Sequence, residues 1–591
     1  MLVSAVMSVV IGQGFAGEFQ AGIDQMINKV DPTINMGLEV IDLNTGENLY
    51  SRNVNKLLLP ASNMKLISDA AAYLSLGPDY RFQTTLSTNA SVLQGGVLHG
   101  PLYLNMSGDP SFSAADLDTL IAHLKTWGVS RITGNVVIQS SHSMVTPYAT
   151  GVMETDKKYA YGAPVAPVVI DANRMNVTVN PASHAGELAI VEPEDLSGTV
   201  IVDNQVKTVG SSKGCGVSFN MNSENHLTVR GCVGVGQWAL VQRLPIINPK
   251  RYMQGLVHQR LKHAGIMLDG QVGLGQMPAH TLLIASHSSK PIMQIMADTL
   301  KPSDNLYADS LFLHAADKIS GGPVNWAGAA PVIKQFLTQQ TGIDFSTATL
   351  KDGSGLSRDD RLTVNQTVNL LRFLHNRFPI GYEYISALPI GGRDGTLIKR
   401  FKNPGERGMV RAKTGYMSGV MGLSGYLYTP NGHTLAFSMF VNKKPKVGFS
   451  GQYRPLMDAI VTYMIHQKPG GNAAATIAIQ RPVAFEQKPN SLARDRAKSA
   501  KWRYIESSLK KALAGQSVTV LFKGNHLILR DNSSDVNRVW SALKNVNQHS
   551  PFAVILKSTS SPSGSGPTLL WVKSYNVLNR SKRTWTLNDV S

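Results

Sequence analysis

The sequence predicts a protein of the α/β (α+β) class in three parts: a domain whose antiparallel sheet is flanked by helices, a long β-rich insertion in that domain, and an extra C-terminal α+β domain. Strand patterns lie near both ends of the first domain, around residues 37–51 and 410–441, with helix patterns beside them. Alternating strand patterns fill most of the interval between them. A Pro- and Gly-containing run near residue 470 and a change of charge mark the last part.

Length and composition suit a folded protein with several cores. The chain has 591 residues, of which 43% are hydrophobic and 16% charged, and a chain of this length divides into several domains. The body of the chain holds no apolar stretch of about 18 residues, so we expect no internal transmembrane helix. The predicted parts are a signal peptide (1–16), the first domain (17–85 and 288–466), the insertion (86–287), a linker (467–499) and the C-terminal domain (500–591).

The first 16 residues are predicted to be a signal peptide. An apolar run ends in small residues, with a cleavage site expected after Ala16, although the first basic residue is Lys29. A buried N-terminal strand is the alternative. A signal peptide implies export to the periplasm, where disulfides form.

The elements of the first domain and the insertion follow from periodicity and turn residues. A helix is expected first, then a strand pair around a turn, then a helix that begins at Ser62 and stops at Gly77. Further on, an amphipathic helix and three strands are expected, the last two joined as a hairpin. These elements are the strands Gly37–Asp42 and Glu47–Ser51, the helix Ala114–Thr126, and the strands Val410–Tyr416, Gly422–Tyr428 and Thr434–Val441.

A serine and a lysine stand one helical turn apart where the second helix begins. Pro60 disfavours helix for the residue before it, and the apolar helix pattern begins at Ser62. Ser62 and Lys65 therefore share a helix face, so the amine can approach the hydroxyl. A serine needs a neighbouring base to act as a nucleophile, and a lysine can be that base where burial and nearby cations lower its pKa. A helix cap with a solvated lysine is the alternative.

Two further polar segments occur later in the chain. Ser303 and Asn305, two residues apart, begin a predicted helix, where capping is the ordinary role. Lys413 and Thr414 lie on a predicted edge strand and would present a charge and a hydroxyl to a carboxylate, and Gly415 lets another backbone or a ligand come close. A lysine that protects a sheet edge is the alternative.

Each segment alone is a weak signal. Ser-x-x-Lys recurs from Ser507, Ser508 and Ser541, and Ser-x-Asn recurs from Ser87 and Ser223. All three segments in this order, each in a fitting local setting, form a much stronger signal than any one of them.

With these segments the chain resembles the class C low-molecular-mass penicillin-binding proteins, which are serine D-alanyl-D-alanine carboxypeptidases and endopeptidases of bacterial peptidoglycan. The resemblance covers about residues 18–465. It includes a separation of 241 residues between Ser62 and Ser303, which agrees with the long insertion of this class. It also includes the segments Tyr161–Val165, Asp352–Arg358 and Leu388–Leu397.

The resemblance implies a serine β-lactamase/transpeptidase-like catalytic domain and an acyl-enzyme on Ser62. Lys65 would accept the Ser62 proton, and Ser303 would pass a proton to the departing amine. No metal or organic cofactor would be needed, and β-lactams would acylate the serine. The implied catalytic residues are Ser62, Lys65, Ser303, Asn305 and Lys413.

The implied substrate is a peptidoglycan peptide, bound by Thr414, Gly415, Tyr416 and Asp156. Tyr416 replaces the small hydroxyl residue that the family usually has there, so its ring would narrow the cleft. Its backbone N–H, with that of Ser62, would stabilise the oxyanion. Asp156 would contact the diamino acid of the stem peptide, and Glu154 is the alternative acid.

Two other functions remain open. One is a β-lactamase or esterase on the same scaffold, which would hydrolyse a β-lactam rapidly instead of keeping a lasting adduct. The other is a non-catalytic wall-binding protein that acts through its basic C-terminal domain. The complete set of implied catalytic residues favours the peptidase.

The two cysteines of the chain, Cys215 and Cys232, lie in strand-like stretches on either side of a predicted turn. A hairpin would bring them within disulfide reach, and export would favour a bond. In a reducing compartment they would remain thiols. No His or Cys stands at ligand spacing nearby, so no metal site is predicted there.

The C-terminal region is strongly basic. Residues 466–591 hold 19 Lys+Arg and 6 Asp+Glu, a net charge of +13 out of +18 for the whole chain. Its basic surface would meet an anionic wall polymer or a membrane surface, or have no specific partner. No nucleic-acid-binding motif is recognisable, so no nucleic-acid partner is predicted. The expected elements are two helices, Trp502–Leu513 and Val536–Val546, and four strands, Val518–Phe522, Leu527–Arg530, Phe552–Leu556 and Leu569–Lys573.

Overall fold

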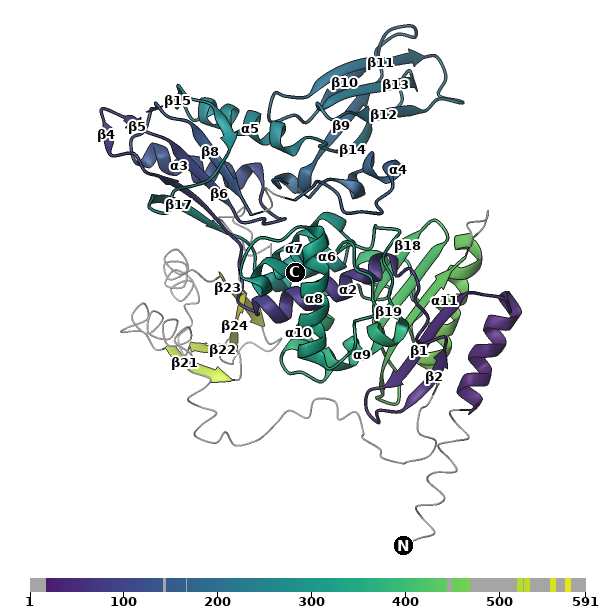
Figure 1. Ribbon diagram of the computed structural model, residues 1–591. Helices are drawn as coiled ribbons and strands as arrows, with labels where there is room; N and C mark the ends of the chain where they lie inside the picture. Colours follow the sequence, from purple (N-terminus) through teal and green to yellow (C-terminus); the bar gives the residue numbers. More distant parts are fainter. Residues whose placement is uncertain are drawn as a thin grey trace. The chain divides into compact units, whose positions relative to one another are not determined.

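The structure, a computed structural model, describes residues 17–141, 145–165, 167–443 and 449–467, and four strands between residues 518 and 575 (Figure 1). The chain divides into two compact units, residues 1–475 and 476–591. The predicted signal peptide, the linker over 467–499 except its first residue, and the two C-terminal helices lie outside the described residues. None of the described helices is both long and apolar enough to cross a membrane.

A five-stranded antiparallel sheet forms the centre of the main domain, in the order β18-β19-β20-β1-β2. The predicted strand pair and hairpin are both present in it. Strand β1 pairs with β20 along its whole length, so segments about 400 residues apart in the chain meet in one sheet. The strands are β1 (Met36–Asp42), β2 (Asn48–Arg52), β18 (Val410–Met417), β19 (Val420–Tyr428) and β20 (Thr434–Asn442).

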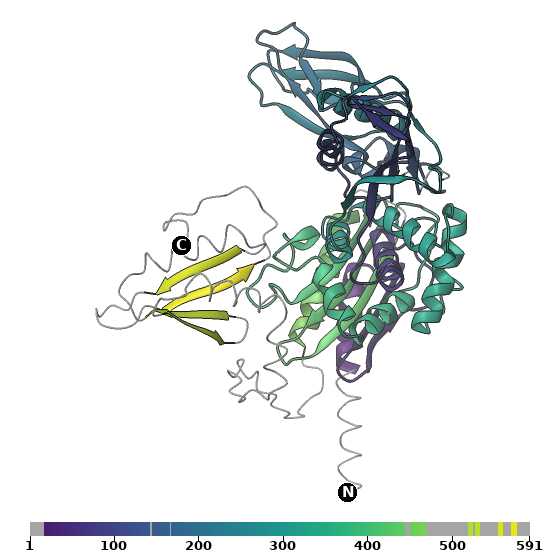
Figure 2. The same ribbon diagram turned by 90° about the vertical axis from the view of Figure 1, so that its left-hand side faces the viewer.

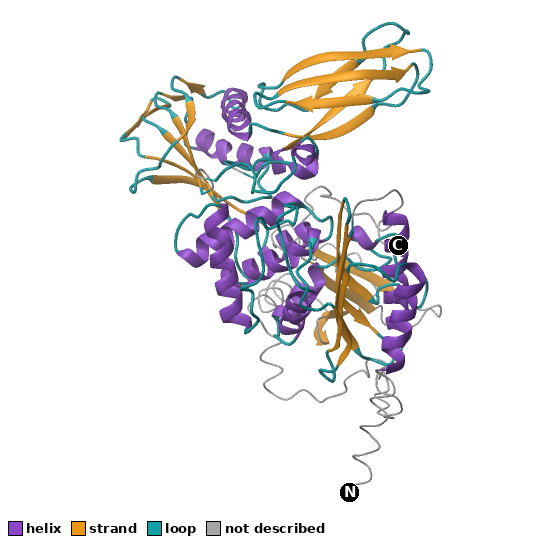
Figure 3. Cartoon of the chain, turned by 45° about the vertical axis from the view of Figure 1, so that its right-hand side comes forward, coloured by secondary structure: helices purple, strands orange, loops and turns teal. Residues whose placement is uncertain are grey.

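Helices cover both faces of this sheet (Figure 3). Strands β19 and β20 are buried along almost their whole length, because alternate side chains enter two different cores. Tyr426 and Phe440 enter the core built by α2 and α7, whereas Leu423 and Phe437 meet α11 and the helix over residues 17–30. The helices are α2 (Met64–Leu76), α6 (Ile292–Leu300), α7 (Asn305–Ser320), α8 (Trp326–Thr341), α9 (Val364–His375), α10 (Ile380–Ala387) and α11 (Phe449–His466).

Side-chain caps set where several of these helices begin. The Asp304 carboxylate accepts the N–H of Tyr307 at the start of α7, and Thr363 and Gln366 form a capping box at the start of α9. Each such cap is worth about 1 kcal/mol of helix stability. Gly321 ends α7 in the left-handed conformation that glycine adopts without strain.

The insertion is rich in strands, as predicted, and several pair in parallel. Its largest sheet has the order β16-β8-β6-β3-β17, and two three-stranded sheets, β10-β9-β14 and β11-β13-β12, form a nested lobe. Helix α3 (Ala114–Thr126) lies where the sequence predicts it, and α4 (Glu154–Lys157) and α5 (Pro249–His263) complete the helices. The strands are β3 (Gln83–Thr88), β4 (Val92–Gln94), β5 (Val97–His99), β6 (Leu102–Met106), β7 (Arg131–Ile132), β8 (Val136–Ser140), β9 (Arg174–Asn180), β10 (Ile190–Pro193), β11 (Ile201–Val209), β12 (Val217–Met221), β13 (His226–Gly234), β14 (Leu240–Pro245), β15 (Met267–Leu268), β16 (Val272–Leu274) and β17 (Leu282–Ser288).

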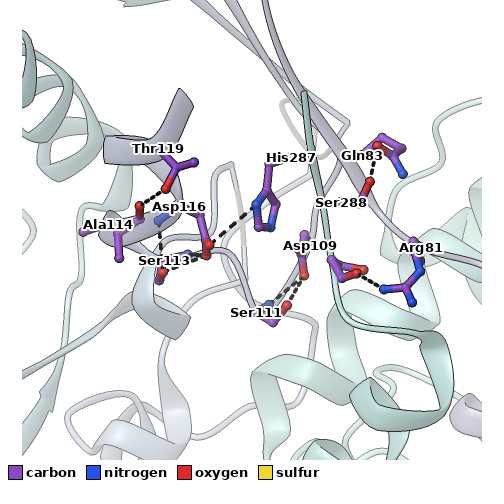
Figure 4. A network of polar contacts seen from close by, with 12 residues as sticks. Arg81, Gln83, Asp109, Ser111, Ser113, Ala114, Asp116, Thr119, His287 and Ser288 are labelled. Atoms are coloured by element: carbon purple, nitrogen blue, oxygen red, sulfur yellow. Dashed lines mark hydrogen bonds and ion pairs between the residues drawn. The ribbon is translucent and has the colours of Figure 1, made fainter. Parts of the chain in front are cut away.

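Two paired strands join the insertion to the main domain (Figure 2). The chain leaves along β3 and returns along the antiparallel β17, so residues 83–85 already belong to the insertion sheet, three residues before the predicted boundary. Polar contacts lie around this junction (Figure 4): Arg81 Nη1 donates to the Ser289 carbonyl at 2.7 Å, next to the paired strands. Within the insertion, His287 Nδ1 lies 3.5 Å from Asp116 Oδ1 of α3.

The predicted disulfide is present. Strands β12 and β13 form the expected antiparallel hairpin, and Cys215 and Cys232 are bonded across it with their Cα atoms 5.2 Å apart. The turn runs from Asn222 to Asn225, because the strands are longer than the sequence predicts.

The second unit contains a four-stranded antiparallel sheet in the order β21-β22-β24-β23. Each strand overlaps one that the sequence predicts and is one or two residues longer. The strands are β21 (Val518–Lys523), β22 (His526–Asp531), β23 (Ala553–Thr559) and β24 (Leu569–Tyr575).

Candidate active site

Ser62 lies on a tight turn that leads into α2. The turn is a short 3-10 helix, Ala61–Asn63, followed directly by the α-helix from Met64. Ala61 has a φ of +47°, a conformation that costs an L-residue roughly 1–2 kcal/mol. The surrounding packing must therefore hold this turn in place.

Lys65 is the centre of the polar contacts around Ser62. Its side chain is buried, and its Nζ lies 3.1 Å from Ser62 Oγ, 2.6 Å from Asn305 Oδ1 and 2.7 Å from the Ser354 carbonyl oxygen. The Asn305 and Ser354 oxygens orient the amine toward Ser62. When Lys65 is neutral, its Nζ can accept the Ser62 proton across the 3.1 Å contact.

Lys413 forms a second buried contact on the other side of the site. Its Nζ donates to Ser303 Oγ at 2.8 Å and to the Thr414 carbonyl at 2.9 Å. The sequence predicts a lysine that presents its charge at the strand edge, but the side chain is fully buried and bound to the serine of the second segment. The hydroxyl of Thr414 is the more accessible group and lies 2.8 Å from the Thr396 hydroxyl.

The outer edge of β18 is open beside Ser62. Strand β18 is the last strand of its sheet, and the Ala412 N–H donates to the Pro389 carbonyl on the side away from β19. Because N–H groups along a strand alternate in direction, those of Thr414 and Tyr416 point to this same side. Tyr416 is 59% exposed, and its ring centroid lies 6.0 Å from the Arg454 guanidinium.

Glycines let three segments close around the serine turn. A Cβ on Gly415 would lie 2.6 Å from Asn63 Nδ2, and one on Gly422 would overlap the same amide. Gly355 has a φ of +78°, and a Cβ there would overlap the Ala61 carbonyl oxygen. The close approach that the sequence predicts at Gly415 is made by the turn that carries Ser62.

Several acidic side chains surround Lys65. One of them, Asp352, orders the loop whose Ser354 carbonyl accepts a hydrogen bond from Lys65. The two Asp352 oxygens accept the N–H groups of Ser354, Gly355 and Ser357, and this loop supplies the Ser354 carbonyl to Lys65. Burial raises the pKa of Asp309 well above its ordinary range. Burial also raises the pKa of Asp69, although the Lys65 and Lys413 charges oppose this rise.

Both lysines have lowered pKa values. Burial lowers the pKa of Lys65 to about 8, against the opposing effect of the acids around it. Burial, reinforced by the neighbouring Lys65 charge, holds the pKa of Lys413 well below its ordinary value. Two amines that share one buried region cannot easily both carry a proton, which favours an amine base close to neutral pH.

The pKa of Lys65 predicts the pH dependence of acylation. Only the unprotonated Lys65 can accept the Ser62 proton, so the rate constant for acylation by benzylpenicillin should rise about tenfold per pH unit below pH ~8 and level off above it. Stopped-flow measurement across this range checks the prediction. A rate that stays flat from pH ~6 to ~9 would contradict a titrating base at Lys65.

The predicted Asp156 is linked to the site through one tyrosine. Asp156 Oδ1 accepts the Tyr161 hydroxyl at 2.9 Å, and the Tyr161 carbonyl accepts Asn305 Nδ2 at 2.9 Å. The alternative acid, Glu154, pairs with Lys157, and its side chain is 85% exposed. Tyr161, Asn305, Trp326 and Leu356 line a common small cavity.

Sequence reasoning assigned no role to several residues of the site. The Ser354 carbonyl and the Thr396 hydroxyl lie in segments that carried the family resemblance, which was the available signal. Arg174, which binds Asp304, gave no signal, because 130 residues separate the two. Within the described residues, no group of three or more His, Cys, Asp or Glu side chains is suited to hold a metal ion.

A serine on a strained turn, a buried amine within hydrogen-bonding distance and an open strand edge form the arrangement that a serine acyl-transfer reaction needs. The family model of the D-Ala-D-Ala carboxypeptidase 3 (S13) family matches residues 19–461. The chain therefore belongs to this family of serine-type peptidases, and its catalytic domain has the β-lactamase/transpeptidase-like fold. The match ends before the basic C-terminal region.

Individual relatives agree with this assignment. The chain is 31% identical over 488 residues to a D-alanyl-D-alanine carboxypeptidase of Actinomadura sp., covering 77% of this chain and 86% of the relative. It is 27% identical over 423 residues to D-alanyl-D-alanine carboxypeptidase DacB of Haemophilus influenzae, covering 71% and 88%. The crystal structure of penicillin binding protein 4 from Haemophilus influenzae superposes with a TM-score of 0.69 at 26% identity and covers 75% of this chain and 99% of that one. The same protein complexed with a novel β-lactam gives a TM-score of 0.65.

Proposed function

We propose that this chain is a D,D-peptidase that cleaves D-alanyl-D-alanine or D-alanyl-diamino acid bonds in peptidoglycan stem peptides. The observation that carries the proposal is the contact of the buried Lys65 Nζ with Ser62 Oγ at 3.1 Å. Family membership over residues 19–461 supports the same reaction class.

Acylation begins with transfer of the Ser62 proton to the neutral Lys65. The serine oxygen attacks the peptide carbonyl, and the backbone N–H groups of Ser62 and Tyr416 stabilise the oxyanion that forms. Asn305 holds the amine in line with the serine through its 2.6 Å contact. The Thr414 hydroxyl and the Lys413 charge hold the terminal carboxylate of the peptide.

The leaving amine needs a proton as the peptide bond breaks. Ser303 relays to this amine the proton that Lys65 took from Ser62, so Lys65 becomes neutral again. Lys413 keeps its own proton and orients the Ser303 hydroxyl from 2.8 Å away. Water then attacks the acyl-enzyme and gives a proton to Lys65, which returns it to Ser62 Oγ as the product acid leaves. Every side chain in these steps comes from one of the three segments that the sequence predicted.

The experiment that tests the proposal is intact-protein mass spectrometry after incubation with benzylpenicillin. We expect one covalent adduct on the native protein, none on Ser62→Ala, and an unchanged adduct on Ser507→Ala, which removes a serine with the same Ser-x-x-Lys spacing. Loss of the antibiotic without an adduct would favour the β-lactamase or esterase. An intact antibiotic without an adduct would favour the non-catalytic wall-binding protein.

We propose that Asp156 binds the free amine of the diamino acid in the stem peptide. Its bond to the Tyr161 hydroxyl places it next to the segment that contacts Asn305. Because a hydrogen bond to a charged group is worth about 2 kcal/mol, Asp156→Asn should raise KM for such peptides roughly thirtyfold. Glu154→Gln should leave KM unchanged. Equal effects of the two variants, or an equal effect of Asp156→Asn on peptides whose amine is acetylated, would contradict this assignment.

We also propose that the protein acts in the periplasm and that its basic C-terminal region is attracted to an anionic wall polymer or membrane surface. The net charge of +13 over residues 466–591 supports this. Co-sedimentation of the full chain with wall fragments, and separately with anionic vesicles, should fall as salt is raised. Binding that does not change with salt concentration would contradict an electrostatic attraction.

A further inference from the structure

An ion pair connects the insertion to the middle of the second catalytic segment. Arg174, the first residue of β9 in the insertion, donates through Nη2 to Asp304 Oδ1 at 2.9 Å and through Nη1 to Asp304 Oδ2. Both side chains are largely buried, with 6% and 16% of their surfaces exposed. A planar guanidinium bound to both carboxylate oxygens fixes the orientation of its partner as well as its distance.

The two neighbours of Asp304 face the two catalytic lysines. Ser303 accepts from Lys413, and Asn305 accepts from Lys65. Ser303 has a φ of +66°, a conformation that an L-residue keeps only where its surroundings hold it. Arg174 binds Asp304, the residue directly after Ser303. The ion pair can therefore stabilise the strained conformation of Ser303.

The chain before Arg174 is also strained, and a buried side chain supports it. Asp171, Ala172 and Asn173 have consecutive φ values of +50°, +54° and +49°. The buried Asn173 donates through Nδ2 to the carbonyls of Pro164 and Val168, at 2.7 and 2.8 Å, and accepts the Ile170 N–H at 3.1 Å. Such conformations persist where other contacts over-determine them, and they cluster at functional sites. This turn sets the backbone position from which the Arg174 side chain extends to Asp304.

A second contact connects the same parts of the molecule. The Tyr161 carbonyl, also in the insertion, accepts Asn305 Nδ2 at 2.9 Å. The insertion thus holds two of the three residues of the segment, while the main domain supplies the lysines.

We infer that Arg174 is a positioning residue of the active site: its two bonds to Asp304 hold Ser303 and Asn305 against Lys413 and Lys65. The inserted domain is then a structural part of the catalytic centre in addition to any role in substrate binding. The inference depends on the acyl-transfer chemistry of Ser62, which the Ser62→Ala adduct experiment tests separately.

A double-mutant cycle on the full chain tests it, with the second-order rate constant for acylation by benzylpenicillin as the readout. Arg174→Ala should lower this constant at least about tenfold, since small displacements of a catalytic group have large effects on rate. Arg174→Lys, which keeps the charge and one donor, should recover part of the loss. Asp304→Asn, which keeps the α7 cap, should lower the rate by a similar factor, and the double variant should be no slower than the slower single variant.

Arg251→Ala is the matched control. Arg251 also lies in the insertion and pairs with Glu224 at 2.9 Å, within the insertion itself. We expect its acylation rate to stay within about twofold of the native rate. Thermal unfolding of each variant shows whether the assay measures folded protein. If Arg174→Ala does not fold, the acylation rate of Arg174→Lys is compared with that of Arg251→Ala instead.

The inference fails if the Arg174 variant that folds acylates as fast as Arg251→Ala. It also fails if the losses of Arg174→Ala and Asp304→Asn multiply fully in the double variant, because the two side chains would then act independently. A purely structural role of Arg174 would lower the unfolding temperature but leave the acylation rate of the folded protein unchanged, which would also overturn it.

Discussion

Replacing Lys65 by methionine is expected to lower the rate constant for acylation by benzylpenicillin about a thousandfold, the range that loss of a general base produces. Methionine has a similar length and no charge, so it can occupy the buried site without an amine. The contacts of Lys65 Nζ to Ser62, Asn305 and Ser354 are all lost in this variant. Mass spectrometry over a time course measures the rate of adduct formation.

Lys334→Met is the control for this substitution. Lys334, on α8, donates to the Ser346 and Ala348 carbonyls with Nζ–O distances of 2.7 and 2.8 Å. Its acylation rate should remain at the native value. Lys65→Met should keep a cooperative thermal transition, because methionine carries no buried charge. A rate for Lys65→Met within about tenfold of the native rate would mean that another group accepts the Ser62 proton.

The second large effect is expected for Gly355→Ala. A Cβ at this position would overlap the Ala61 carbonyl oxygen and lie 3.0 Å from Met64 Cβ, and the backbone has a φ of +78°. The strain of the left-handed conformation and the overlap together should lower the free energy of unfolding by about 3–4 kcal/mol. Since the displaced groups belong to the Ser62 turn, acylation should fall as well. Denaturant unfolding and the penicillin adduct measure the two effects.

Gly342→Ala separates the two causes. Gly342 ends α8 with a φ of +72°, and an added Cβ there meets nothing within 4 Å. This variant should lose only the conformational part, about 1 kcal/mol, and acylate normally. If Gly355→Ala is no less stable than Gly342→Ala, the serine turn and the Asp352 loop are not in the close contact described above.

Much of the local structure could be predicted, because local signals determine it. Helix α3 has the predicted bounds, since Ser113 and Asp116 form a capping box and its apolar residues repeat at helical spacing. The β19–β20 hairpin follows from two short, mostly apolar stretches on either side of a Pro- and Gly-containing turn. The pairing of β1 with β20 could not be predicted in the same way, because nothing in either strand specifies a partner 400 residues away.

The candidate site also combines features that local sequence predicts with contacts between distant segments. The sequence predicted Ser62, Lys65 and Ser303 as site residues because the proposed chemistry depends on residue types at fixed short spacings. It did not show that Lys413 turns inward to Ser303, since that contact joins segments 110 residues apart.

The sequence by itself predicted the side chains that we propose for the chemistry, the starts of helices α2 and α7 to within two residues, and the family that the segments resemble. The tertiary structure decided how those side chains are charged and held. Only the folded chain buries Lys65 and Lys413 next to each other and so lowers their pKa values. Only the folded chain brings Arg174 to Asp304. Burial and long-range pairing depend on how distant segments pack, and no short stretch of sequence contains that information.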